Sequence, residues 1–89
     1  MAYEVEFISS LFKSPGNSGW TFAMVPDEYA PSVTLAWGRV PVVANVDGYE
    51  WKTSVWREKT GTLLPVPKRA RGTKGDGDSV TVRLSFSTV

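Results

Sequence analysis

Residues 38–55 read GRVPVVANVDGYEWKTSV, the part of the sequence with the clearest secondary-structure signals. Its first half is rich in valine, at positions 40, 42, 43 and 46, and such β-branched runs are typical of strands. The dipeptide Asp47-Gly48 that follows is preferred in two-residue type I′ turns. After the turn, apolar and polar side chains alternate, as they do in a half-buried strand. The stretch therefore predicts a β-hairpin.

On both sides of this hairpin, similar alternation predicts further strands at residues 3–12, 20–24, 60–64 and 79–86. Proline and acidic residues at 26–30 favour a short helical turn that extends to about residue 36. A second helical turn is predicted at 68–71, ended by Gly72. Six or so short strands in 89 residues indicate one all-β domain, residues 1–89. A closed antiparallel barrel is favoured because few strands carry the lysines that protect exposed edges.

Composition narrows the chemistry, because the chain contains no histidine and no cysteine. The commonest general base, the usual zinc ligands, the thiolate nucleophile and the disulfide are all excluded. We therefore expect no cofactor, no metal and no recognisable catalytic motif. A net charge of +1 argues against nucleic acid as the partner. The absence of cysteine, of a leader pattern and of a long apolar run predicts a cytoplasmic protein without a membrane partner.

Four stretches together resemble a bacterial family, the domain of unknown function 1905. They are WTFAMVP at 20–26, VANVDG at 43–48, LPVPKRAR at 64–71 and GDSVTV at 77–82. The resemblance covers nearly the whole chain and implies a small double-split β-barrel, related in shape to the barrels of AbrB-like transition regulators. It implies no activity. The chain departs from typical members by its aromatic load, at Trp37, Trp51 and Trp56.

The tryptophans are the first candidates for a binding surface. Trp20 and Trp51 fall on the apolar faces of their strands, so we expect both to pack in the core. Trp56 is out of phase with Trp51 and Val55. It therefore either faces outward beside Arg57, as a contact for a ligand or partner, or returns inward through a β-bulge. Trp37 either covers one mouth of the barrel or plugs its core.

The second candidate is the basic stretch Lys68, Arg69, Arg71 and Lys74, which places four cations in seven residues. Such a group is suited to phosphate or carboxylate. Asp76 and Asp78 follow directly, and a turn that satisfies its own charges is the favoured interpretation. Residues 72–78 fit neither the phosphate-loop nor the EF-hand spacing, so we expect a plain turn into the last strand.

The leading hypothesis is a non-catalytic module that binds a small apolar or anionic ligand, or a partner protein. Its predicted contacts are Trp37, Trp51, Trp56, Arg57, Lys68 and Arg71. One alternative is a cofactor-free enzyme of the cyclase or pericyclase type, which needs only an aromatic cavity that holds a reactive conformer. A second is nucleic-acid binding by analogy with AbrB-like barrels. We expect a monomer first and a swapped dimer second.

Overall fold

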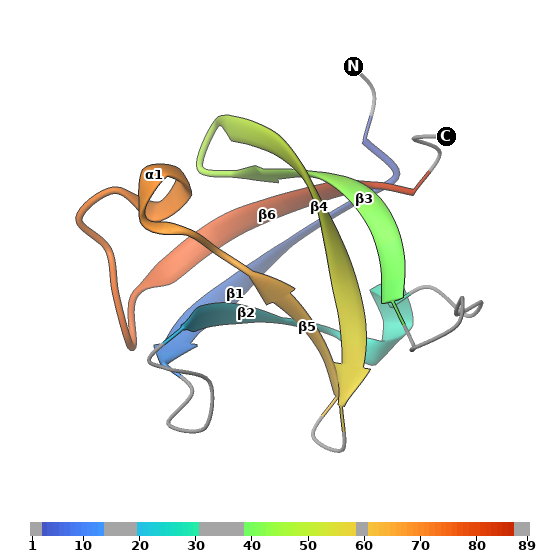
Figure 1. The fold of residues 1–89 in the computed structure, drawn as a ribbon, viewed down its shortest axis with the longest axis horizontal. Helices are drawn as coiled ribbons and strands as arrows, with labels where there is room; N and C mark the ends of the chain where they lie inside the picture. The colour runs from blue at the N-terminus through green and yellow to red at the C-terminus, as the bar shows by residue number, and fades with distance from the viewer. Residues whose placement is uncertain (1–2, 14–19, 31–38, 59–60, 87–89) are drawn as a thin grey trace.

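Six antiparallel strands close into a barrel in the order β1-β2-β5-β4-β3-β6 (Figure 1). The computed structural model describes residues 3–13, 20–30, 39–58 and 61–86. Within these ranges the strands are β1 (Val5–Lys13), β2 (Thr21–Val25), β3 (Arg39–Val46), β4 (Tyr49–Glu58), β5 (Gly61–Pro65) and β6 (Ser79–Ser85). The predicted all-β barrel is confirmed.

The hairpin of β3 and β4 is the longest paired segment of the barrel and forms as predicted. The two strands pair without interruption from Val46↔Tyr49 to Arg39↔Trp56. Asp47 and Gly48 have φ values of 50° and 97°, the left-handed conformation that a type I′ turn requires at both central positions. An uninterrupted register leaves no bulge within this pairing, so successive side chains of β4 point to opposite faces.

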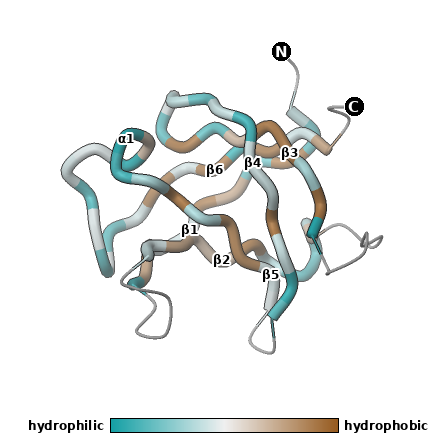
Figure 2. Tube along the Cα trace, viewed as in Figure 1, coloured by the Kyte–Doolittle hydropathy of each residue, from teal (hydrophilic) through white to brown (hydrophobic). Residues whose placement is uncertain are grey.

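The barrel interior is filled by aliphatic and small side chains from all six strands, with Phe7 as the aromatic member. Figure 2 shows hydrophobic residues on the strands and hydrophilic ones at the turns. The buried residues that form this core are Phe7, Leu11, Ala23, Val25, Val42, Ala44, Val46, Val55, Leu64, Val66, Ala70, Val80, Val82 and Leu84. Tyr29, from the short helical turn after β2, stacks on Phe7 with ring centroids 5.7 Å apart.

Both helical turns are present and short. The first is a single 3-10 turn, η1 (Asp27–Tyr29), and the second is α1 (Lys68–Arg71), which ends at Gly72 with φ 62°. The predicted extension to residue 36 and Trp37 lie outside the described residues. Among the residues that are described, no helix has the length and apolar character needed to cross a membrane.

The tip of the β3–β4 hairpin is tied to β6 by Asp47. One carboxylate oxygen accepts the Thr81 backbone N–H at 2.9 Å, and the other accepts the Lys74 ammonium at 2.9 Å. The Thr81 N–H and, next, Lys74 hold the pKa of Asp47 below its usual value, because both favour the ionised carboxyl. The turn before β6 thus satisfies its charges partly through the hairpin.

Candidate ligand pocket between β4 and β5

The candidate site lies where β4 and β5 separate. The two strands pair only over Trp56↔Leu63, Arg57↔Thr62 and Glu58↔Gly61. On its other side β5 stays paired with β2, from Val25↔Thr62 to Phe22↔Pro65. One wall of the barrel therefore opens beyond Leu63 (Figure 1).

Two prolines explain the separation. The Val66 N–H donates to the Thr21 carbonyl of β2, at 2.9 Å. Because backbone groups alternate in direction along a strand, residues 63, 65 and 67 then direct theirs toward β4. Positions 65 and 67 are both proline and have no N–H to donate. The β4–β5 ladder consequently stops at Leu63, while the β2–β5 ladder, which uses the even-numbered residues, is unaffected.

The opening holds a pocket of about 440 Å³. It is lined by side chains and backbone of β4, by the start of β2, and by the segment from the end of β5 into α1. The lining residues are Trp20, Thr21, Trp51, Lys52, Thr53, Pro65, Val66, Pro67, Arg69 and Arg71. A volume of this order suits a small organic molecule.

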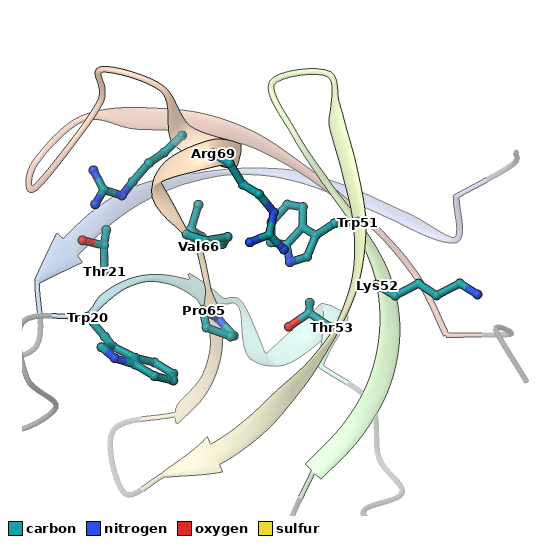
Figure 3. Close-up of a pocket in the computed structure, with 10 residues that line it drawn as sticks. Trp20, Thr21, Trp51, Lys52, Thr53, Pro65, Val66 and Arg69 are labelled. Atoms are coloured by element: carbon teal, nitrogen blue, oxygen red, sulfur yellow. The ribbon is translucent and has the colours of Figure 1, made fainter.

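Tryptophans form two of the pocket's walls. Trp51 lies on the inward face of β4, half-buried and packed against the core. Trp20 lies at the other side of the opening, next to Thr21 and Pro65 (Figure 3). Its side chain is 54% exposed, so the expectation that Trp20 packs in the core is wrong. Trp20 lies on the outer face that it shares with Phe22, since the core residues of β2 are Ala23 and Val25. It is exposed because it precedes β2, where the described part of the chain places no strand across from it.

The charged groups that line the pocket are all cationic. Arg69 extends from α1 toward Trp51, whereas the side chain of Lys52 points away from the opening (Figure 3). Arg71 donates from Nη1 to the Lys74 carbonyl at 2.9 Å, and its Nε is buried without a hydrogen-bond partner among the described residues. No carboxylate is among the lining residues that the structure describes. The pocket is thus lined by two arginines and two tryptophans.

The acidic residues that follow the basic stretch do not neutralise these arginines within the described part of the chain. Asp76 accepts the Lys13 backbone N–H at 2.9 Å, and Asp78 accepts the Gly75 N–H at 2.8 Å. Both carboxylates hold the turn that leads into β6, where Gly77 has φ 90°. The predicted turn is confirmed, but its charges are satisfied without Arg69 or Arg71.

Trp56 belongs to an aromatic cluster on the outer face of the barrel, and this cluster shares Trp20 with the pocket. The unbroken β4 register directs Trp56 away from the core side of Val55, so the outward alternative is the correct one. Trp56 packs edge-on against Phe22 at 5.6 Å and lies 6.4 Å from Trp20 between ring centroids. The Arg39 guanidinium carbon lies 5.1 Å from the centroid of the Trp56 ring, in a cation–π contact.

The structure therefore divides the predicted contact residues. Trp51 and Arg71 line the pocket, whereas Trp56, Arg57 and Lys68 do not, and Trp37 lies outside the described residues. The sequence indicated Arg69 only as a member of the basic stretch at 68–74, and it assigned Trp20 to the core. The signal that would have located the pocket is the Pro-x-Pro spacing at 65–67, which removes two successive N–H donors from the side of the chain that faces β4, at the end of β5 and just beyond it.

The described residues contain no group of three acidic side chains placed to hold a metal ion. The pocket lies at the wall of the barrel, and the interior beside it is packed with side chains.

Comparison with known proteins identifies the family. The sequence profile of the domain of unknown function 1905 (DUF1905) matches residues 7–84. This match spans most of the 89 residues, so the chain belongs to that family, as the resemblance indicated. A search of curated proteins returned no match.

Proposed function

We propose that this DUF1905 chain is a binding module whose ligand is a small anion with an aromatic or apolar body. The observation that carries the proposal is the lining of the β4–β5 pocket, where the described residues supply two indoles, two arginines and no carboxylate (Figure 3). An anion with a flat apolar body satisfies both parts of this lining at once.

The physical argument begins with Arg71. A guanidinium presents several N–H donors in a plane, and it binds carboxylate or phosphate through two parallel hydrogen bonds. In Arg71 one donor is engaged by a carbonyl, while the Nε donor is buried and has no partner in the described part of the chain. A buried donor without a partner costs about 1–3 kcal/mol, so an anion that accepts from it after a shift of the Arg71 side chain recovers that energy on binding.

The indoles supply the second part of the affinity. Trp51 is held in place by the core and by Tyr49, whose ring centroid lies 6.0 Å away. Trp20 is held from the other side by Phe22, at 6.2 Å. Because both rings are already positioned, a flat apolar ligand buries their exposed surface with little loss of side-chain entropy.

The test uses three probes of one shape: 2-naphthoate, 2-naphthylmethanol and 2-naphthylmethylamine. Binding is followed by NMR through the indole N–H and arginine side-chain signals. We expect the acid to bind at least tenfold more tightly than the alcohol, and the amine to bind most weakly. Equal binding of the acid and the alcohol would overturn the proposal.

Charge-matched variants locate the site. Arg71→Gln and Arg69→Gln should each weaken naphthoate binding about tenfold, the scale of one charge-assisted hydrogen bond. Lys13→Gln is the control, because Lys13 is exposed on β1 and outside the pocket lining. A comparable loss in Lys13→Gln, or a loss in Arg57→Gln alone, would show that the anion binds elsewhere and would contradict the assignment.

A further inference from the structure

A backbone edge of β4 also borders the pocket, and among the described residues β5 pairs with this edge only from Trp56 to Glu58. The two-residue turn at Asp47-Gly48 makes Val46 and Tyr49 a hydrogen-bonded pair. The odd-numbered residues of β4 therefore bond to β3, and Lys52 and Ser54 direct their N–H and C=O groups toward β5. Lys52 lines the pocket although its side chain points away, so its backbone faces the opening (Figure 3).

The segment opposite this edge cannot supply a backbone donor. Continuing the register from Trp56↔Leu63 places Pro65 across from Ser54 and Pro67 across from Lys52. Proline has no N–H, so neither carbonyl of β4 receives the hydrogen bond that a strand partner normally gives. A carbonyl that faces a binding pocket without a protein donor selects ligands that bring an N–H.

We infer that the ligand carries an amide N–H close to its anionic group, as in an N-acyl amino acid or the C-terminal residue of a peptide. The inference rests on the proposed function, because it takes the anion to lie at Arg69 and Arg71. The amide N–H then donates to the Lys52 carbonyl, and the apolar part of the ligand contacts Trp51 or Trp20. The Lys52 carbonyl and the Arg69 guanidinium, which extends toward Trp51, are complementary to the amide N–H and the anionic end of such a ligand (Figure 3).

The decisive experiment compares hippurate with benzoyloxyacetate, in which an ester oxygen replaces the amide N–H. The two acids share shape and charge and differ at that group. We expect hippurate to bind about fivefold to tenfold more tightly, the effect of one hydrogen bond to a buried acceptor. Equal affinities would overturn the inference.

A second measurement reads the acceptor directly. The Lys52 carbonyl ¹³C resonance should move downfield when hippurate binds and should stay in place with the ester. The carbonyls of Trp51 and Thr53 are internal controls, because they face β3 and already accept hydrogen bonds there. A shift at those carbonyls with none at Lys52 would contradict the proposed contact.

A third experiment distinguishes the two kinds of ligand that carry this group, a peptide C-terminus and a small N-acyl amino acid. Along an extended peptide, N–H groups that point the same way recur every second residue, which matches the carbonyls of Lys52 and Ser54. Acetyl-Phe-Gly-Gly with a free carboxylate should bind at least fivefold more tightly than hippurate if the natural ligand is a peptide C-terminus. Weaker binding of the peptide assigns the pocket to small N-acyl amino acids.

The two proposals fail in different ways. If 2-naphthoate binds at the arginines and hippurate gains nothing over its ester, the anion site stands and the amide inference is wrong. If neither naphthoate nor hippurate binds, the proposed function itself is wrong.

Discussion

The two edges of strand β4 show how one strand can be built both for stability and for binding. Along its edge with β3, β4 is paired from Tyr49 to Trp56. Along its edge with β5, it is paired only from Trp56 to Glu58. The edge paired with β3, called the closed edge below, belongs to two strands that are consecutive in sequence and joined by a tight turn. The edge toward β5, called the open edge below, faces the pocket.

The two edges of β4 differ in pairing because the partner residues that direct their backbone groups toward β4 have an N–H on one side and are prolines on the other. On β3 every residue opposite a hydrogen-bonding position of β4 has an N–H, because Pro41 lies across from Ser54, whose backbone points the other way. On the β5 side, Pro65 and Pro67 both occupy positions that would bond to β4. Proline is thus tolerated where its nitrogen faces away from the neighbouring strand, and it ends the ladder where its nitrogen faces that strand.

The largest expected effect comes from moving proline onto β4 itself. Thr53→Pro removes the N–H that bonds to Val42 on the closed edge, and we expect a loss of about 3–4 kcal/mol in the free energy of unfolding. Ser54→Pro makes the same change one residue later, where the N–H faces the open edge, and should cost about 2 kcal/mol less. Urea unfolding followed by tryptophan fluorescence measures both.

The pair of variants is its own control, because both impose the same φ restriction on adjacent strand residues. A third variant, Thr53→Ala, separates the loss of the Thr53 side chain from the loss of its N–H. Equal losses in Thr53→Pro and Ser54→Pro would mean that the two edges of β4 contribute alike, and the comparison would fail.

Local patterns were sufficient to predict most of the fold. The hairpin at Asp47-Gly48, the strands and the helical turn ended by Gly72 all follow from signals within a few residues. The barrel order β1-β2-β5-β4-β3-β6 brings together strands that are distant in sequence, such as β1 and β6. Alternation of side chains shows which face is buried and leaves open which strands are neighbours.

The site was harder to predict for the same reason. Trp20 and Phe22 share one face of β2 by their spacing, yet Phe22 is fully buried and Trp20 is exposed. Phe22 is covered by Trp56 from β4 and by Phe12 from β1, at ring centroid distances of 5.6 and 5.9 Å. The spacing of Trp20 and Phe22 also predicted that their face of β2 points into the barrel interior, whereas this face lies on the outside of the barrel. Only the assembled barrel shows which apolar face is inside and which tryptophan borders a pocket.

A smaller effect on stability is expected at the Asp47-Gly48 turn, which connects β3 to β4. Asp47→Asn keeps a residue suited to the type I′ turn and removes the charge that binds Lys74 and Thr81. We expect a loss of about 1 kcal/mol at pH 7. Lys74→Gln should lower the free energy of unfolding by less than Asp47→Asn does, because the Thr81 N–H influences the pKa of Asp47 more than Lys74 does.

The pH dependence of this loss follows from the lowered pKa of Asp47. A carboxyl whose pKa is lower in the folded state stabilises that state fully above its unfolded pKa, and loses the contribution as the pH falls through the folded value. The difference in unfolding free energy between the wild type and Asp47→Asn should therefore be constant near neutrality and shrink below about pH 4. A difference that grows on acidification would contradict the role of the charge.

The smallest expected effect is at the open edge, in Pro65→Ala. The variant loses the restriction that proline places on the unfolded chain, about 0.4–1 kcal/mol. It gains an N–H directed at the Ser54 carbonyl, and one such hydrogen bond contributes about 1 kcal/mol. The two changes nearly cancel, so the free energy of unfolding should change by less than about 0.5 kcal/mol. Pro41→Ala on β3, outside the pocket, is the matched control.

Pro65→Ala should instead lengthen the hydrogen-bonded ladder between β4 and β5. We expect the new backbone amide at position 65 to be protected from hydrogen exchange and the affinity for hippurate to fall, because the β4–β5 pairing extends by one step into the pocket. Rapid exchange of that amide with unchanged hippurate affinity would mean that something other than the missing donor keeps the strands apart. The packing of Trp20 beside Pro65 would then be the next cause to test, since both residues line the same opening.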